Sequence, residues 1–138
     1  ANGLSPAISR SALYFDTVDD LVFNQELTIN SSNDNINILS AIAFSAKSVI
    51  FRGNTKVQGI SKSQYGIIFD LTVNINNIGS FGPIPYEIDI IGSGQCFGIQ
   101  FINVDTFTTT DFVDIDIVGY AVNLFTCPSE SYGINLAS

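Results

Sequence analysis

Four acidic residues have the types and the spacing that glycoside hydrolysis or calcium binding would use. They form two pairs at positions i and i+2, Glu87 with Asp89 and Asp114 with Asp116. A glycosidase works with two carboxyl groups about 5–10 Å apart. Alternation along a half-buried strand also places acids at this spacing, on the side that faces water. We favour this polar face over a hydrolase.

The same acids are candidate calcium ligands, because Ca²⁺ is bound by carboxylate and carbonyl oxygens. Asp114, Asp116, Glu87 and Asp89 would crowd two neighbouring strands, where like charges are destabilising unless a cation relieves them. The Asp-x-Asp-x-Asp-Gly pattern of calcium loops is absent from the sequence. Calcium is therefore the single metal that we retain, and no other cofactor is expected.

Histidine is missing from the chain altogether. Its absence removes the commonest general base near neutral pH, the Ser-His and Cys-His nucleophile pairs and the usual zinc and copper ligands. Neither a Ser-x-x-Lys motif nor a phosphate-binding glycine loop takes their place. The sequence therefore predicts a protein that is not an enzyme.

Cys96 and Cys127 are the two cysteines of the chain. A bridge between them would close a loop of about 30 residues and contribute roughly 3 kcal/mol to stability. The alternative is two separate buried thiols, and two cysteines alone do not decide between them. We favour the bridge because both cysteines lie beside turn residues, where chain segments can approach each other.

The charge of the chain excludes several partners. Its net charge is −8 with five basic residues, so it lacks the clustered Lys and Arg that bind nucleic acid or anionic membranes. There is no apolar run long enough to insert into a bilayer.

Four of the five basic residues lie in the segment from Lys47 to Lys62. They are expected to pair either with acids of the same chain or with acids of an identical subunit, and both alternatives stay open.

Only 13% of the residues are charged, about half the usual share of a soluble domain. Such a surface is expected to be covered by neighbouring subunits, so the predicted partner is a second copy of the chain. No methionine stands at position 1, which suggests that a signal peptide or a longer stalk precedes Ala1.

Strand signals dominate, and no sustained helical period is found. The clearest strands lie at 111–119, at 85–91 and at 67–75. Turns are expected at Asn30–Asn35 and at Gly79–Pro85, where Asn, Ser, Gly and Pro gather. Further strands are expected at 12–15, 21–29, 36–44, 47–52, 55–61, 98–104, 120–124 and 132–136.

About nine or ten short strands at this spacing predict an all-β fold, an antiparallel β-sandwich or jelly roll. Residues 1–138 would form a single domain, with 1–11 as an extended arm. A parallel β-helix is the main competitor, but no fixed repeat period supports it.

One segment resembles the complement/tumour-necrosis-factor-like jelly rolls. It is Val57-Gln-Gly-Ile-Ser-Lys-Ser-Gln-Tyr-Gly-Ile-Ile-Phe-Asp-Leu-Thr-Val73, in which Tyr65 would be the aromatic residue that enters the central strand of that family. The Gly that usually precedes this Tyr is replaced by Gln64, and a Gly follows at position 66.

Other segments are similar to the opening and closing strands of the same family. The opening strand would be 12–15, and the closing strands would be 112–124 and 132–136. The nearest variety is the collagen-tethered head domain of bacterial spore-surface proteins. The resemblance implies a homotrimer with apolar strand faces packed about a three-fold axis.

We therefore expect a self-assembling structural subunit, extracellular or on the surface of a cell, spore or virion, forming a trimeric head or a filament. An adhesive rim would suit this role. Apolar strand faces would carry assembly, and the candidate residues are Phe69, Leu71, Val73, Ile115, Ile117 and Val122. The alternative is a lectin-like module that binds a glycan, with or without calcium.

Overall fold

The computed structural model describes residues 11–71, 77–80, 86–102, 106–109, 113–122, 127 and 132–137. The described residues form strands separated by short turns. The strands are β1 (Leu13–Asp16), β2 (Asp20–Phe23), β3 (Leu27–Asn33), β4 (Ser40–Ala46), β5 (Ser48–Phe51), β6 (Thr55–Ser61), β7 (Tyr65–Leu71), β8 (Asn77–Ser80), β9 (Tyr86–Gly94), β10 (Phe97–Ile102), β11 (Thr106–Thr109), β12 (Val113–Ala121) and β13 (Tyr132–Ala137).

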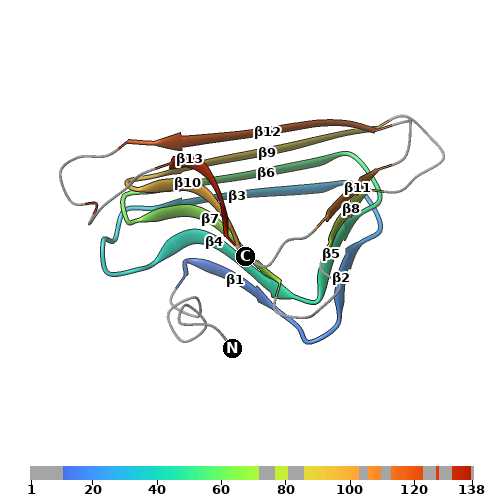
Figure 1. Ribbon diagram of the computed structural model, residues 1–138, viewed down its shortest axis with the longest axis horizontal. Helices are drawn as coiled ribbons and strands as arrows, with labels where there is room; N and C mark the ends of the chain where they lie inside the picture. The colour runs from blue at the N-terminus through green and yellow to red at the C-terminus, as the bar shows by residue number, and fades with distance from the viewer. Residues whose placement is uncertain are drawn as a thin grey trace.

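Every strand pair is parallel, and the chain winds as a β-solenoid around a triangular cross-section (Figure 1). Sheet A has the order β1-β4-β7-β10-β13, sheet B β11-β8-β5-β2 and sheet C β12-β9-β6-β3. Each turn of the chain adds one strand to each sheet. The predicted antiparallel β-sandwich or jelly roll is therefore wrong, and with it the fold that the family resemblance implies.

The repeat is hidden in the sequence because successive turns differ in length. Phe15, Phe44, Phe69 and Phe101 are neighbours in the register of sheet A, yet they lie 29, 25 and 32 residues apart. Turns between strands absorb these differences without moving the strands out of register. Strand alternation is the same in parallel and antiparallel sheets, so the local pattern could not reveal the strand direction.

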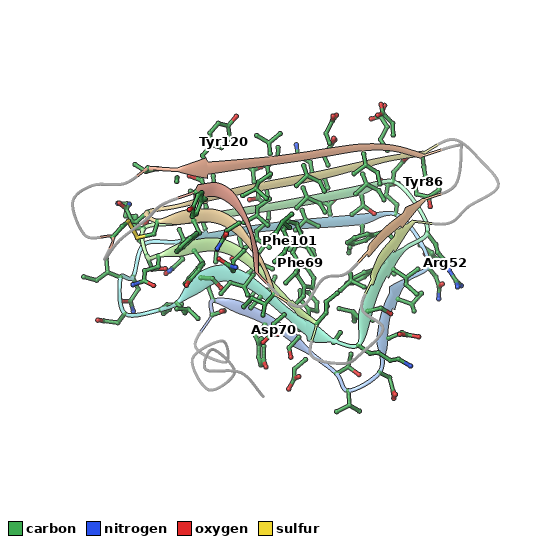
Figure 2. All side chains as sticks on the ribbon, viewed as in Figure 1. Arg52, Phe69, Asp70, Tyr86, Phe101 and Tyr120 are labelled. Carbon is green, nitrogen blue, oxygen red and sulfur yellow. A yellow bond between two sulfur atoms is a disulfide. The ribbon has the colours of Figure 1, made fainter. Side chains whose placement is uncertain are left out.

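Stacked side chains fill the interior of the solenoid. The rings of Phe15 and Phe44 lie 5.2 Å apart, those of Phe44 and Phe69 4.7 Å, and those of Phe69 and Phe101 5.2 Å. Phe69 and Phe101 point into the space between the sheets (Figure 2). Each buried Phe side chain contributes about 1.5–3 kcal/mol through removal from water, so this row is a main source of stability.

Glycines allow sheets A and C to converge at one corner. On sheet C the register aligns Gly59, Gly92 and Gly119. A Cβ added at Gly59 would lie 2.8 Å from the carbonyl oxygen of Gly66 on sheet A. Added Cβ atoms at the other two glycines would meet the carbonyl oxygens of sheet A glycines even more closely. The facing pairs are Gly59 with Gly66, Gly92 with Gly98, and Gly119 with Gly133.

The same corner carries buried polar side chains, and here a predicted turn is partly wrong. Strand β3 continues to Asn33, into the segment expected to form a turn. The Asn33 side chain donates hydrogen bonds to Ser61 Oγ at 3.0 Å and to Ser63 Oγ at 3.3 Å on the next turn of the solenoid. Its Oδ1 accepts from the Asn35 amide at 2.9 Å. Strand β3 can therefore include a buried polar residue, because side chains of the next turn of the solenoid form hydrogen bonds with it.

The outer face of sheet A is buried on its central strands. Ile68, Asp70 and Gln100 are buried although they point away from the interior row of phenylalanines. Gln100 Oε1 accepts a hydrogen bond of 2.9 Å from Asn135 Nδ2 on β13. Strands β7 and β10 consequently have two covered faces, which is why they are rich in apolar residues on both sides.

Candidate functional site

The four predicted acids lie on the outer face of sheet C, on two adjacent strands. Glu87 is the register partner of Asp114, and Asp89 is the partner of Asp116. Glu87, Asp114 and Asp116 are exposed, while Tyr86, Ile88 and Ile90 of the same strand β9 are buried. The predicted crowding of these acids on neighbouring strands is confirmed.

A shallow groove of about 670 Å³ runs across this face where sheet C begins. Its lining combines four acids with polar and apolar side chains and one cation: Glu26, Leu27, Thr28, Asn54, Thr55, Lys56, Tyr86, Glu87, Asp89 and Asp114. Among the described residues, no group of three or more His, Cys, Asp or Glu side chains is arranged to hold a metal ion. The calcium site therefore stays a prediction.

Acid–base hydrolysis would place different demands on the same face. It requires one carboxyl group that stays protonated in a water-poor environment beside a second, ionised one. Glu87 and Asp114 are in contact with solvent. The two carboxyl groups of the groove therefore both contact water. This is not the water-poor environment that the acid of a hydrolase requires.

A second acidic row was not foreseen. On sheet A, Asp16, Ser45 and Asp70 are register neighbours, and Asp70 lies on the outer side of that sheet (Figure 2). Burial, followed by the charge of Asp16, raises the pKa of the Tyr14 hydroxyl, with a smaller contribution from Asp70. Strand alternation predicts that Asp70 lies opposite Phe69, but it carries no information that this outer face is covered.

Two of the basic residues have side-chain partners within the described part of the chain. Lys62 Nζ lies 3.7 Å from Asp34 Oδ1, and Arg52 donates a hydrogen bond of 3.2 Å to Asn24 Oδ1. Lys56 stands next to Asp89 in the register of sheet C. Lys62–Asp34 is thus an ion pair within the chain, and an exposed pair of this kind contributes little to stability. Whether the other basic residues pair with acids of the same chain or of an identical subunit stays open.

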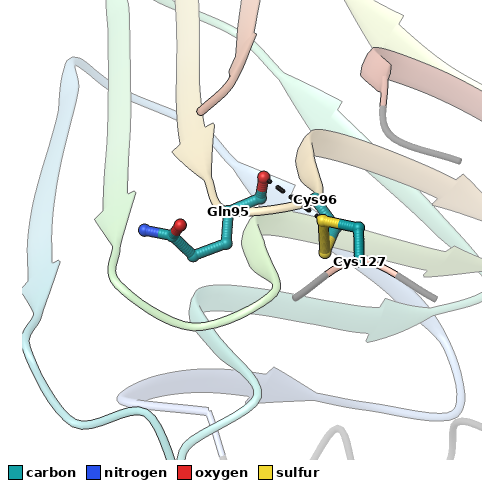
Figure 3. Close-up of a disulfide and its surroundings, with 3 residues drawn as sticks. All are labelled: Gln95, Cys96 and Cys127. Carbon is teal, nitrogen blue, oxygen red and sulfur yellow. Dashed lines mark hydrogen bonds between the residues drawn. A yellow bond between two sulfur atoms is a disulfide. The ribbon is translucent and has the colours of Figure 1, made fainter. Parts of the chain in front are cut away.

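Cys96 and Cys127 form the disulfide that the sequence left open (Figure 3). Their Cα atoms lie 5.5 Å apart. Cys127 Sγ lies 3.6 Å from the carbonyl oxygen of Gln95, a polar contact rather than a hydrogen bond, since a bridged sulfur carries no hydrogen. The bridge fixes the chain between β12 and β13 to the corner between β9 and β10.

The residues predicted to carry assembly fall in three different environments. Phe69 and Leu71 are completely buried in the interior. Ile115 and Ile117 are partly buried and pack against the interior from β12. Val122 is exposed, and Val73 lies outside the described residues.

Strand β13 is an edge strand of sheet A, and the sequence did not predict an exposed apolar edge there. In the described part of the chain β13 pairs only with β10. Ile134 is the register partner of Ile99, and Leu136 is the partner of Phe101. Ile99 is 0% exposed and Phe101 1%, whereas Ile134 is 40% and Leu136 68% exposed.

The opposite end of the solenoid also presents apolar side chains. Ile29 of β3 is buried, whereas five residues of β1, β2 and β3 pack against the core but are only partly buried: Leu13, Phe15, Leu21, Phe23 and Leu27. In the described part of the chain, the first strand of each sheet is therefore less completely covered than the central strands. Solenoids normally cover such ends with polar capping repeats.

Comparison with known proteins gives no relative. Neither a protein-family model nor a curated protein nor a solved structure matches this chain. Among the described residues there is no helix long and apolar enough to cross a membrane. The features of the described residues that bear on function are the exposed edge strand β13, the acidic face of sheet C and the disulfide.

Proposed function

We propose that this chain is a non-enzymatic structural subunit that associates with copies of itself through the exposed apolar side chains of β13. One observation carries the proposal: Ile134 and Leu136 continue two rows of the interior, yet they are exposed. Apolar residues in such an arrangement are stabilised when another molecule removes them from water.

The edge itself favours association. A terminal strand of a sheet presents N–H and C=O groups that can pair with another strand, and exposed apolar edges are sites of intermolecular pairing. Strand β12 of sheet C adds the exposed side chains of Val118 and Tyr120, and Val122 follows directly after this strand. Tyr120 projects from the outer face of sheet C (Figure 2).

An extracellular or surface location is part of the same proposal. Disulfides persist in oxidising surroundings and are rare in reducing ones, and the Cys96–Cys127 bridge supports this location. The trimer implied by the jelly-roll resemblance needed apolar strand faces around a three-fold axis. The described strands form a solenoid instead, so we do not propose that trimer.

Sedimentation velocity over a wide concentration range tests the proposal. The wild-type chain is expected to associate, and Leu136→Lys to weaken association about ten- to hundredfold, because a charge replaces a buried apolar contact. Ile60→Lys is the matched control, since Ile60 is 42% exposed on the outer face of β6, away from both ends. A wild-type chain that stays monomeric at high concentration, or equal behaviour of the two variants, would overturn the proposal.

A further inference from the structure

We infer that Asn30 is an acceptor for an N-linked glycan that projects from the outer face of sheet C. Asn30-Ser31-Ser32 is the only Asn-x-Ser/Thr sequence of the chain. This is the pattern at which oligosaccharides are attached to asparagine in secreted proteins. The inference goes beyond the proposed self-association, because it concerns a covalent modification on a different sheet.

Strand alternation places the two required side chains of this sequence on one side. Asn30 and Ser32 stand two residues apart on β3, and residues at that spacing point to the same face of a sheet. Both are exposed, whereas Ile29 and Asn33 of the same strand are buried. The amide and the hydroxyl that the modification requires therefore face solvent together.

The side chains of Asn30 and Ser32 are not committed to the fold. Within the described part of the chain, neither of them forms a side-chain hydrogen bond. Asn33 gives the contrast on the same strand, because it is 5% exposed and its side chain donates to Ser61 and Ser63. A glycan at Asn33 would disrupt these bonds, whereas a glycan at Asn30 displaces only water.

The middle residue of the sequence points to the other side of the strand. Ser31 is partly buried, and its Oγ donates a hydrogen bond of 2.9 Å to the carbonyl oxygen of Ala41 on β4. This bond ties sheet C to sheet A inside the solenoid. The internal contact and the glycan therefore lie on opposite sides of β3 and do not compete.

The immediate surroundings of Asn30 are polar and uncharged. Thr28 and Ser32 flank it on the same face of β3, and Gln58 is its register partner on β6. Hydroxyl and amide groups can donate hydrogen bonds to sugar hydroxyls and accept bonds from them. Strands β3 and β12 stand at opposite sides of sheet C (Figure 1), so the glycan is remote from the exposed apolar side chains of β12.

The attachment is a glycosyl transfer in which nothing is oxidised or reduced. The donor is an oligosaccharide linked to an isoprenoid pyrophosphate. A bond forms between Nδ2 of Asn30 and the anomeric carbon, the bond from that carbon to the pyrophosphate oxygen breaks, and the isoprenoid pyrophosphate leaves with the electron pair. One amide proton passes to a base of the transferase. The Cys96–Cys127 disulfide supports the oxidising compartment in which secreted chains are modified.

Secretion of the full chain from eukaryotic cells, behind a cleavable signal peptide, tests the inference. Intact mass before and after treatment with peptide N-glycosidase measures the glycan, and peptide mapping locates it, because the enzyme leaves an aspartate in place of the modified asparagine. The wild-type chain is expected to carry one glycan. Asn30→Gln and Ser32→Ala should each abolish it. Ser31→Ala is the matched control and should keep it, since both required side chains remain.

The other outcomes would contradict the inference. A wild-type chain secreted without a glycan would overturn it, and so would a glycan that persists in Asn30→Gln. Urea denaturation before and after removal of the glycan tests the outward position of Asn30. Equal midpoints are expected, because the glycan contacts solvent; a chain that folds only after removal of the glycan would contradict that position. Circular dichroism of each variant, compared with the wild type, establishes that the variants are folded.

Discussion

Leu136 lies beside Phe101 in the register of sheet A, but 68% of Leu136 is exposed and only 1% of Phe101. The same row contains Phe15, Phe44 and Phe69 further along the solenoid. The interior row therefore continues onto β13, where its side chain is exposed in the described part of the chain. This continuity connects the fold to the proposed self-association.

Truncation of the central phenylalanine should be the most destabilising change in the interior. Phe69→Ala removes a ring that stacks on Phe44 and on Phe101, and the expected loss of unfolding free energy is about 3–5 kcal/mol. Phe69→Leu keeps most of the apolar volume and should cost about 1.5 kcal/mol or less. Urea denaturation measures both, and equal losses for the two variants would contradict the stacked interior.

The convergence of sheets A and C predicts that a single methyl group is not tolerated at Gly92. Its Cβ would collide with the backbone of Gly98, so Gly92→Ala is expected to lower the unfolding free energy by about 1–3 kcal/mol, or more. Ser93→Ala, on the neighbouring residue of β9, removes only a hydroxyl and serves as the control. A Gly92→Ala variant as stable as Ser93→Ala would show that the two sheets are further apart.

Reduction of the Cys96–Cys127 disulfide should destabilise the chain. The bridge joins residues 31 positions apart, and a loop of this size corresponds to about 3–4 kcal/mol of lost chain entropy in the unfolded state. Urea denaturation with and without a reducing agent measures the effect. The double variant Cys96→Ala and Cys127→Ala should not respond to the reducing agent; a response would mean that the agent acts elsewhere.

Alkaline conditions should weaken the fold through Tyr65. Burial raises the pKa of the Tyr65 hydroxyl above its ordinary value. The folded chain therefore keeps this proton at pH values where the unfolded chain has lost it. The stability that this group contributes is complete below a pH of about 10 and is lost as the pH rises through the raised folded-state pKa.

The Tyr65 effect is measured by urea denaturation at several pH values on both sides of this range. Tyr65→Phe keeps the ring that stacks on Phe97 and removes the titrating hydroxyl. The variant should lose less stability than the wild type as the pH rises. Parallel losses in the two proteins would exclude Tyr65 as the cause and assign the alkaline effect to other groups.

Local patterns predicted many of the strands but not their direction; β8 and β11 were not predicted, and the single strand expected at 21–29 is divided between β2 and β3. Strand β6 has the predicted bounds Thr55–Ser61, and the outward position of Glu87 and the inward position of Ile88 follow from alternation. These features are common to sandwiches and solenoids. The distinguishing feature, a row of phenylalanines in adjacent turns, is obscured because the turns differ in length.

The candidate site was predicted only in part, for a similar reason. Alternation predicts on which face of its strand each acid lies, but it does not predict which strands are neighbours; the pairing of β9 with β12 brings the acids together. The exposure of an interior-row side chain depends on whether its strand lies at the edge of the sheet. No local sequence pattern encodes that position. Phe69 and Leu136 occupy the same interior row, but only the position of β13 at the edge of sheet A leaves Leu136 exposed.

Glycines were the signal most easily misinterpreted. Gly92 and Gly119 lie within strands, where glycine usually weakens a sheet. Their spacing on neighbouring strands and their approach to Gly98 and Gly133 explain them. On sheet A, Gly66 and Gly98 each stand three residues before a phenylalanine of the interior row, Phe69 and Phe101, and this recurring spacing is a signal of the parallel β-helix that no fixed repeat period reveals.

Hydrogen–deuterium exchange of the segment 132–137, measured at low and at high protein concentration, tests the central claim most directly. If β13 is the docking edge, exchange of its backbone amides should slow markedly as the concentration rises, while exchange in β6 at the middle of the solenoid stays constant. Exchange in β13 that is independent of concentration, in a sample that sediments as an oligomer, would contradict the assignment of the open end as the assembly surface.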